Sequence, residues 1–287
     1  MGFKFSAKDT SATRAVRRIA AELLATSHAE IATPRLPRDQ LVHELRKSVK
    51  KTRALLRLVR PGMKGFAAEN AALRDAARLI APLRDADVLA ASFDKVAGDL
   101  ALPSYTTDAL RARLPGRTGA TIDAEALLAA HDKAIAVIAA RAKGWKVEGK
   151  GFDALAPGLE RSWTAAQKAM KSALKAPDAA ALHLWRKRVK DHWYHARLLA
   201  PVWPEMMAHH ITAADILGET LGDARDLAAL AEALNDIPEA RSLREEALRQ
   251  EERLLTDAQA LGTRFLSEPA TGLSRRWRGW WEIWTKA

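Results

Sequence analysis

The sequence predicts an all-α protein that carries an internal tandem repeat. Composition is the first reason, because Ala, Leu, Arg, Lys and Glu dominate the 287 residues and favour helix. Phe, Tyr, Ile and Val are too sparse for a large sheet. Amphipathic, Ala/Leu-rich segments between Pro and Gly breaks are the second reason. The third is a pair of basic stretches, HELRKSVKKTRALLRLVR at 43–60 and HLWRKRVKDHWYHARLLA at 183–200.

Each amphipathic segment predicts one helix. Breaks such as Pro61-Gly62 and Pro201 mark where helices end. The Gly/Lys-rich stretch KGWKVEGKG at 143–151 predicts a linker in the middle of the chain. The predicted helices span 10–30, 37–60, 66–97, 106–115, 121–142, 154–174, 178–200, 205–234, 238–261 and 272–285.

Two matches at nearly the same offset indicate the duplication. A shift of 140 residues places His43 on His183, and the same shift aligns Arg46, Lys47, Lys50 and Arg57 with Arg186, Lys187, Lys190 and Arg197. Further on, IAPLRDADVLA at 80–90 aligns with LGDARDLAALA at 221–231, which places Arg84-Asp85 over Arg225-Asp226. Each half is therefore expected to hold about four main helices in roughly 140 residues.

The positive charge of the chain is concentrated in the two basic stretches. The net charge is +11 and the pI is about 10.0. Residues 43–60 carry a net +6 and residues 183–200 a net +4, so the rest of the chain is nearly neutral. Such local crowding predicts a polyanionic partner rather than a generally charged surface.

Other features bound the cellular setting. There is no cysteine, which excludes disulfides and thiolate zinc sites and fits a reducing cytoplasm. The first residues lack the apolar run of a signal peptide. No stretch approaches the roughly 20 apolar residues of a spanning helix, so we expect a cytoplasmic protein without a membrane segment.

The first basic stretch divides cleanly when it is wound as a helix. With His43 at zero, the other five cations of its basic face fall between about −80° and +40°. Leu45, Val49, Leu56 and Val59 fall on the opposite side, between about 160° and 240°. A solvated helix face is the plain alternative, but such a face normally mixes charge signs. Stacked like charges are destabilising, so this pattern favours a bound anion.

The histidines and the Arg-Asp pairs each leave several roles open. His43 and His183 could ligate a metal, act in catalysis or hydrogen-bond an anion. No ligand cluster, nucleophile or Gly-rich phosphate loop accompanies them, so we favour anion contact. His192 and His195 point away from the basic face. In Arg84-Asp85 and Arg225-Asp226, which we expect within helices, Asp either orients a groove residue or forms an ordinary ion pair.

These residues resemble the CHAD family, the conserved histidine α-helical domain. The resemblance rests on HELRKSVKKTRALLRL at 43–58, PLRDADVL at 82–89, HLWRKRVKDHWYHARLL at 183–199 and LGDARDLAAL at 221–230, and covers roughly 10–285. It implies two four-helix bundles related by a pseudo-twofold, with the two basic helices lining a central basic groove or pore. It implies binding of inorganic polyphosphate and association with polyphosphate granules, without catalysis, cofactor or metal. We take 1–287 as one CHAD domain, with halves at 10–142 and 152–287.

The resemblance and the duplication together give a set of candidate site residues. Asp85 and Asp226 are the expected orienting residues. Arg18 and Arg161 are added because they lie at comparable places in the two halves. The residues expected to bind polyphosphate are Arg18, His43, Arg46, Lys47, Lys50, Arg53, Arg57, Arg84, Arg161, His183, Arg186, Lys187, Lys190, Arg197 and Arg225.

The sequence departs from the family pattern at several places. Ala81 stands where a Gly is expected before the first Arg-Asp pair. Arg53 aligns with Trp193 and Lys51 with Asp191, so the second copy is less cationic and the halves need not contribute equally.

Three other functions are less compatible with the sequence than polyphosphate binding. Nucleic-acid binding is the main alternative, but the first basic helix has no aromatic residue for base stacking. A phosphate-processing enzyme needs metal-binding carboxylates, and Asp85 and Asp87 face different directions on a helix. The C-terminal SRRWRGWWEIWTKA could lie at a membrane interface, but its Trp spacing favours a final helix docked on the core. Polyphosphate-metabolising enzymes are candidate protein partners, whereas nucleic acid and membrane are not expected.

Overall fold

The computed structural model describes residues 2–83, 85–114 and 123–286, with the backbone alone for 85–88. This part of the chain is all-helical and contains no strand. The prediction of an all-α protein is confirmed. The α-helices are α1 (Ala12–Ala32), α2 (Arg38–Leu58), α3 (Phe66–Leu79), α4 (Asp85–Asp99), α5 (Ser104–Arg111), α6 (Ala124–Ala142), α7 (Ala156–Lys175), α8 (Ala179–Leu199), α9 (Pro204–Ala233), α10 (Arg241–Phe265) and α11 (Ala270–Trp284).

One predicted helix, 66–97, is wrong as a single element. The structure ends α3 at Leu79, places a short 3-10 turn over Ala81–Leu83, and begins α4 at Asp85. Pro82 explains the break, because proline lacks an N–H and its ring clashes with the preceding helical turn. Asp85 is therefore the first residue of α4 and not an interior residue of a longer helix. The other predicted helices are present, with ends shifted by a few residues.

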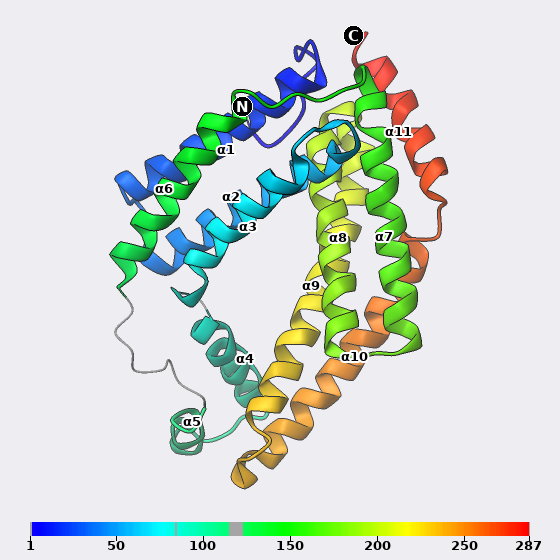
Figure 1. The fold of residues 1–287 in the computed structure, drawn as a ribbon. Coiled ribbons are helices and arrows are strands. Elements are labelled where there is room, and N and C mark those ends of the chain that lie inside the picture. The colour runs from blue at the N-terminus through cyan, green and yellow to red at the C-terminus, as the bar shows by residue number, and fades with distance from the viewer. Residues whose placement is uncertain (1, 84, 115–122, 287) are drawn as a thin grey trace.

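The helices form two groups that meet along α2 and α8. α1 packs on α2 and α6, and α3 packs on the same two helices. α8 packs on α7 and α9, and α10 lies along α9. α4 leaves the first group and packs against α9 and α10, with α5 beside it. Figure 1 shows α4 and α5 at the lower end, where they approach the far ends of α9 and α10.

The main hydrophobic core is shared by the two groups. It runs from Phe5 and α1 through α2 and α3 to Trp163 of α7, Trp185 of α8 and Trp277 of α11. Gly158 lets α7 cross the end of α2 closely, since a Cβ there would lie 1.7 Å from the carbonyl oxygen of Leu58. The two groups are thus packed backbone against backbone where α7 crosses the end of α2.

Residues 143–150 are a fixed connection, although the sequence predicts a linker there. Thr13 of α1 exchanges two hydrogen bonds with the backbone of Val147, at 2.9 and 3.1 Å. Arg17 donates to the carbonyl oxygen of Trp145 at 2.6 Å, and the side chains of Trp145 and Val147 are buried. This stretch crosses the upper end of the molecule between α6 and α7 (Figure 1).

The C-terminal helix docks on the core, as the Trp spacing predicts. Trp277 is completely buried, and Trp281 packs edge-on against Phe5 with ring centroids 5.7 Å apart. Trp280 packs edge-on against Trp203, with ring centroids 5.2 Å apart. Across the described residues, no helix combines the length and apolar character that crossing a bilayer requires.

Candidate functional site

The basic faces of α2 and α8 line one groove of about 620 Å³, here called the central groove. Each helix buries its apolar side in the core, with Leu45, Val49 and Leu56 on α2 and Trp185 and Val189 on α8. Burial of that side leaves the cations facing the opening. The predicted residues that line the groove are His43, Arg46, Lys47, Lys50, Arg53, Arg57, His183, Arg186, Lys187, Lys190, Arg225 and Asp226.

Three predicted residues lie elsewhere. Arg18 is held by Asp9 at 2.7 Å and Glu22 at 3.3 Å, and lines a pocket between α1 and α6. Arg161 is exposed on α7 and does not line the central groove. Arg197 points into a separate pocket beside the groove. They lie outside the central groove because neither helical spacing nor the repeat fixes how far each long side chain lies from it.

The first Arg-Asp pair is only partly placed. Arg84 lies outside the described residues, and of Asp85 only the backbone position at the start of α4 is described. In the second pair, Arg225 donates to Asp226 at 2.7 Å, and both line the groove. Among the described residues no hydrogen bond joins Asp226 to His183. Asp226 is therefore paired with its neighbouring arginine and not with His183.

Carboxylates on α9 and α8 also line the groove, and of these only Asp226 is among the site residues predicted from the sequence. Lys190 is held by Asp215 at 2.9 Å and by Glu219 at 2.7 Å. Asp191 of α8 accepts from Arg57 of α2 at 2.8 Å, which ties the two basic helices together. Asp215, Glu219 and Asp226 form what we call the acidic stripe of α9. The sequence does contain a pattern that could have predicted this stripe, because these acids recur at helical spacing close to the second Arg-Asp pair.

Two glycines of α9 make room for the cations of α8. A Cβ at Gly218 would lie 2.5 Å from the side chain of Lys190, and one at Gly222 would lie 2.7 Å from that of Arg186. Glycine costs about 1 kcal/mol relative to alanine in a helix interior. The two glycines therefore lower the stability of α9 but allow the side chains of Lys190 and Arg186 to lie close against it.

The cations of the central groove are crowded in their present arrangement. Burial and then the charge of Arg57 lower the pKa of Arg53 to about 10. Burial and then the charge of Arg188 lower the pKa of Lys187. The pKa of His183 is lowered by burial and then by Arg225, Lys187 and Arg186. Each shift disfavours the charged form, so a bound anion would relieve the crowding.

The remaining histidines of α8 are structural. His195 is buried and lies 2.9 Å from the carbonyl oxygen of Ala54 in α2, measured from its Nε2. His192 is buried too, with its Nε2 at 2.7 Å from the Nε2 of His210. Their position away from the basic face is as the helical angles predict. In the described part of the chain, no group of three or more His, Cys, Asp or Glu side chains is arranged to hold a metal ion.

Removing the acids that hold Lys190 is expected to strengthen anion binding. In Asp215→Asn/Glu219→Gln the ammonium group loses both carboxylates but keeps its place over Trp193, 4.0 Å from the ring centroid. We expect affinity for a polyanion to rise by about tenfold, because two local negative charges are removed. Calorimetric titration of both proteins measures the change, and Asp153→Asn on the surface is the control. Unchanged affinity would mean that the acidic stripe does not compete with the ligand.

Comparison with known proteins identifies the family. The family model of the CHAD domain matches residues 15–235. The chain belongs to the CHAD domain family. A similar solved structure is the crystal structure of the CHAD domain from the plant Ricinus communis, with a TM-score of 0.58 and 17% sequence identity. That match covers 93% of this chain and 96% of the other. No curated protein matches the chain. The CHAD fold therefore extends over nearly all of the chain, and the basic helices α2 and α8 lie inside the matched segment.

Proposed function

We propose that this CHAD protein binds inorganic polyphosphate in the central groove and catalyses no reaction. The observation that carries the proposal is the convergence of cations from α2 and α8 on one groove, from segments about 140 residues apart. Polyphosphate is a flexible chain with about one negative charge per phosphate and no bases. Arginine offers it forked donors and lysine offers mobile point charges.

The proposal includes two four-helix bundles related by a pseudo-twofold. The packing order supports it, because α1, α2 and α3 follow one another in contact as α7, α8 and α9 do. α2 and α8 would then be the matching helices, and the central groove would lie near the pseudo-axis. Unequal halves follow from Trp193 and Asp191, which stand where α2 has Arg53 and Lys51.

Nucleic acid is the second candidate ligand, and the aromatic residues of the groove argue against it. Lys190 lies 4.0 Å and Arg197 4.6 Å from the ring centroid of Trp193, so two cations already cover this ring. Tyr194 is nearly buried and packs edge-on against Phe3. Single-strand binders need open aromatic faces on which bases stack.

The biological setting of this binding is part of the same proposal. A protein that binds polyphosphate without catalysis would associate with polyphosphate granules in the cytoplasm. Polyphosphate-metabolising enzymes are its candidate partners there. The roles of His43 and His183 are those of hydrogen-bonding anion contacts, since each lines the groove beside the cations of its own helix.

A competition experiment tests the proposal. Long-chain polyphosphate is titrated by calorimetry near physiological salt, and single-stranded RNA and duplex DNA of equal charge are added as competitors. We expect Lys50→Glu/Lys190→Glu to weaken polyphosphate binding by more than about tenfold, because two groove cations become acids. Arg161→Glu/Lys168→Glu makes the same charge change on the exposed face of α7 and should have little effect. Equal or tighter binding of nucleic acid would overturn the choice of polyanion.

Binding is expected to strengthen as the pH falls from about 8 to about 6. In the free protein the pKa of His183 is lowered by burial, Arg225, Lys187 and Arg186. A bound polyanion offsets that repulsion and raises the pKa, so binding takes up a proton and is favoured at lower pH. His183→Gln should keep most of the affinity at pH 8 and lose much of the pH dependence. Calorimetry in two buffers of different ionisation enthalpy measures the proton uptake directly, and no uptake by the parent protein would contradict this role.

A further inference from the structure

A second pocket lies beside the central groove and has its own cations. This side pocket has a volume of about 470 Å³. Its cations come from three segments, namely Lys4 of the N-terminal stretch, Lys51 of α2 and Arg197 of α8. The other lining residues are Gly2, Phe3, Ala200 and Ile211. No carboxylate lines this pocket among the residues that the structure describes.

The cations of the side pocket differ from those of the central groove in their pairing. In the groove, Arg57 and Lys190 each hold a carboxylate within 3 Å. Within the described ranges, neither Lys51 nor Arg197 forms an ion pair or donates a side-chain hydrogen bond. Burial and then the charge of Arg197 lower the pKa of Lys51. Lys51 and Arg197 are therefore close enough to repel each other, and neither is held in an ion pair.

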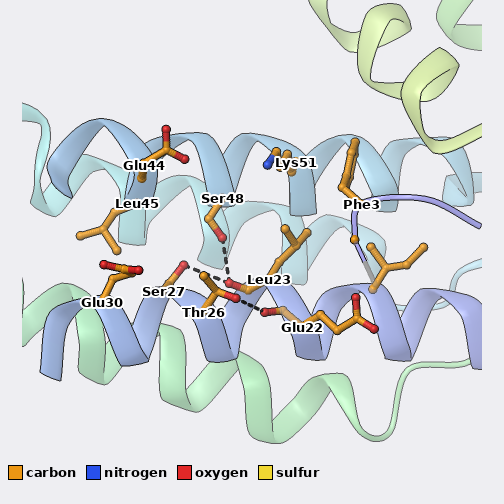
Figure 2. A pocket seen from close by; sticks show the side chains of 12 residues that line it. Phe3, Glu22, Leu23, Thr26, Ser27, Glu30, Glu44, Leu45, Ser48 and Lys51 are labelled. Atoms are coloured by element: carbon orange, nitrogen blue, oxygen red, sulfur yellow. Dashed lines mark hydrogen bonds between the residues drawn. The ribbon is translucent and has the colours of Figure 1, made fainter. Parts of the chain in front are cut away.

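Three acids line a different cavity, which Lys51 also reaches. A pocket of about 210 Å³ between α1 and α2 has Glu22, Glu30 and Glu44 in its lining, and Lys51 and Phe3 line it too. Figure 2 shows Glu44 and Glu30 toward one end of that cavity, and Glu22 toward the other end with Lys51 and Phe3. Glu44 raises the pKa of Lys51 only weakly compared with burial and Arg197. The side pocket thus keeps its positive character.

Two aromatic contacts join the side pocket to the central groove. Trp193 lines the groove and carries Arg197 of the side pocket 4.6 Å from its ring centroid. Tyr194 also lines the groove and packs edge-on against Phe3 of the side pocket, with centroids 5.8 Å apart. An anionic chain that leaves the groove past Trp193 therefore reaches Arg197 next.

We propose that the side pocket formed by Lys4, Lys51 and Arg197 is a second phosphoryl-binding subsite, which takes a segment of a polyphosphate chain that extends beyond the central groove. This inference rests on the proposed function. It adds that chain length is read in part outside the groove. Long chains engage both sites, and short chains fit the groove alone, so the subsite contributes affinity only through multivalency.

The test compares two chain lengths across matched variants. Lys51→Gln/Arg197→Gln is titrated with long-chain polyphosphate and with tripolyphosphate, and Arg161→Gln/Lys168→Gln is the control with the same loss of charge. We expect the first variant to bind the long chain about tenfold more weakly and tripolyphosphate within about twofold of the parent. The slope of log affinity against log salt for the long chain should shrink by about one to two, by analogy with single-stranded nucleic acid.

A second variant guards against an indirect effect of losing the Arg197–Trp193 contact. Lys4→Gln/Lys51→Gln leaves that contact in place and should show the same selective loss for the long chain. Equal losses for both chain lengths, or no loss for either, would overturn the subsite while the proposed function stands. Failure of the parent protein to bind polyphosphate of any length would overturn both.

Discussion

Gly158→Ala is expected to destabilise the protein by about 3 kcal/mol, although alanine is the better helix former. The added Cβ would lie 1.7 Å from the carbonyl oxygen of Leu58 and 2.5 Å from its carbonyl carbon. These are backbone atoms of α2 and its end, which cannot rotate away as a side chain can. α7 must move off α2, and the shared core between the two helix groups opens. Chemical denaturation followed by circular dichroism measures the loss.

Gly279→Ala on α11 is the matched control. No atom lies within 4 Å of a Cβ built at Gly279, so only the helix propensity changes. We expect this variant to gain about 0.5–1 kcal/mol, opposite in sign to the effect at Gly158. Equal effects at the two positions would show that the close crossing of α7 and α2 does not limit stability.

Acid is expected to unfold the protein well above the pH at which its carboxylates become protonated. Burial lowers the pKa of His195 and that of His210 to about 4, and it lowers the pKa of His192 well below its usual value. Below about pH 6.5 the unfolded chain takes up protons that the folded protein does not. The stability supplied by neutral histidines is therefore complete above about pH 6.5 and is lost as the pH falls toward 4. The slope is about 1.4 kcal/mol per pH unit for each histidine, which amounts to about 3 kcal/mol for each histidine between about pH 6.5 and 4.

Denaturation curves at several pH values between about 8 and 5 test this expectation. His195→Leu should be less stable at pH 8, because the buried carbonyl of Ala54 loses its partner, which costs about 1–3 kcal/mol. The same variant should lose less stability on acidification, since one proton fewer is taken up on unfolding. A flat stability profile in the parent protein would show that these histidines are not held neutral.

The all-α class and most helix positions follow from the sequence, because they depend on local periodicity. The apolar stripe of α2 at Leu45, Val49 and Leu56 fixes which side faces the core, and the basic side then follows. The repeat adds that α8 behaves in the same way. That the two basic faces would line one groove was implied by the resemblance to the CHAD family, because periodicity does not place the two helices beside each other.

Features that depend on tertiary distance could not be predicted in this way. Arg197 matches Arg57 in the repeat, yet Arg57 pairs with Asp191 in the central groove while Arg197 stacks on Trp193 and lines the side pocket. Arg18 is bound by Asp9, which is nine residues away in an irregular stretch. The acidic stripe of α9 was readable as a pattern, but its position against Lys190 depends on how α8 and α9 cross.

The shared core has a consequence for how the chain is made. Synthesis delivers α1 to α6 well before α7 and α8, and the shared core cannot close completely until Trp277 of α11 has emerged. During that interval the end of α2 has neither Gly158 nor His195 against it. The nascent first half therefore exposes apolar surface on the ribosome, where chaperones and aggregation compete for it. Although the repeat suggests two separable units, the first half cannot complete its core before the second half has been synthesised.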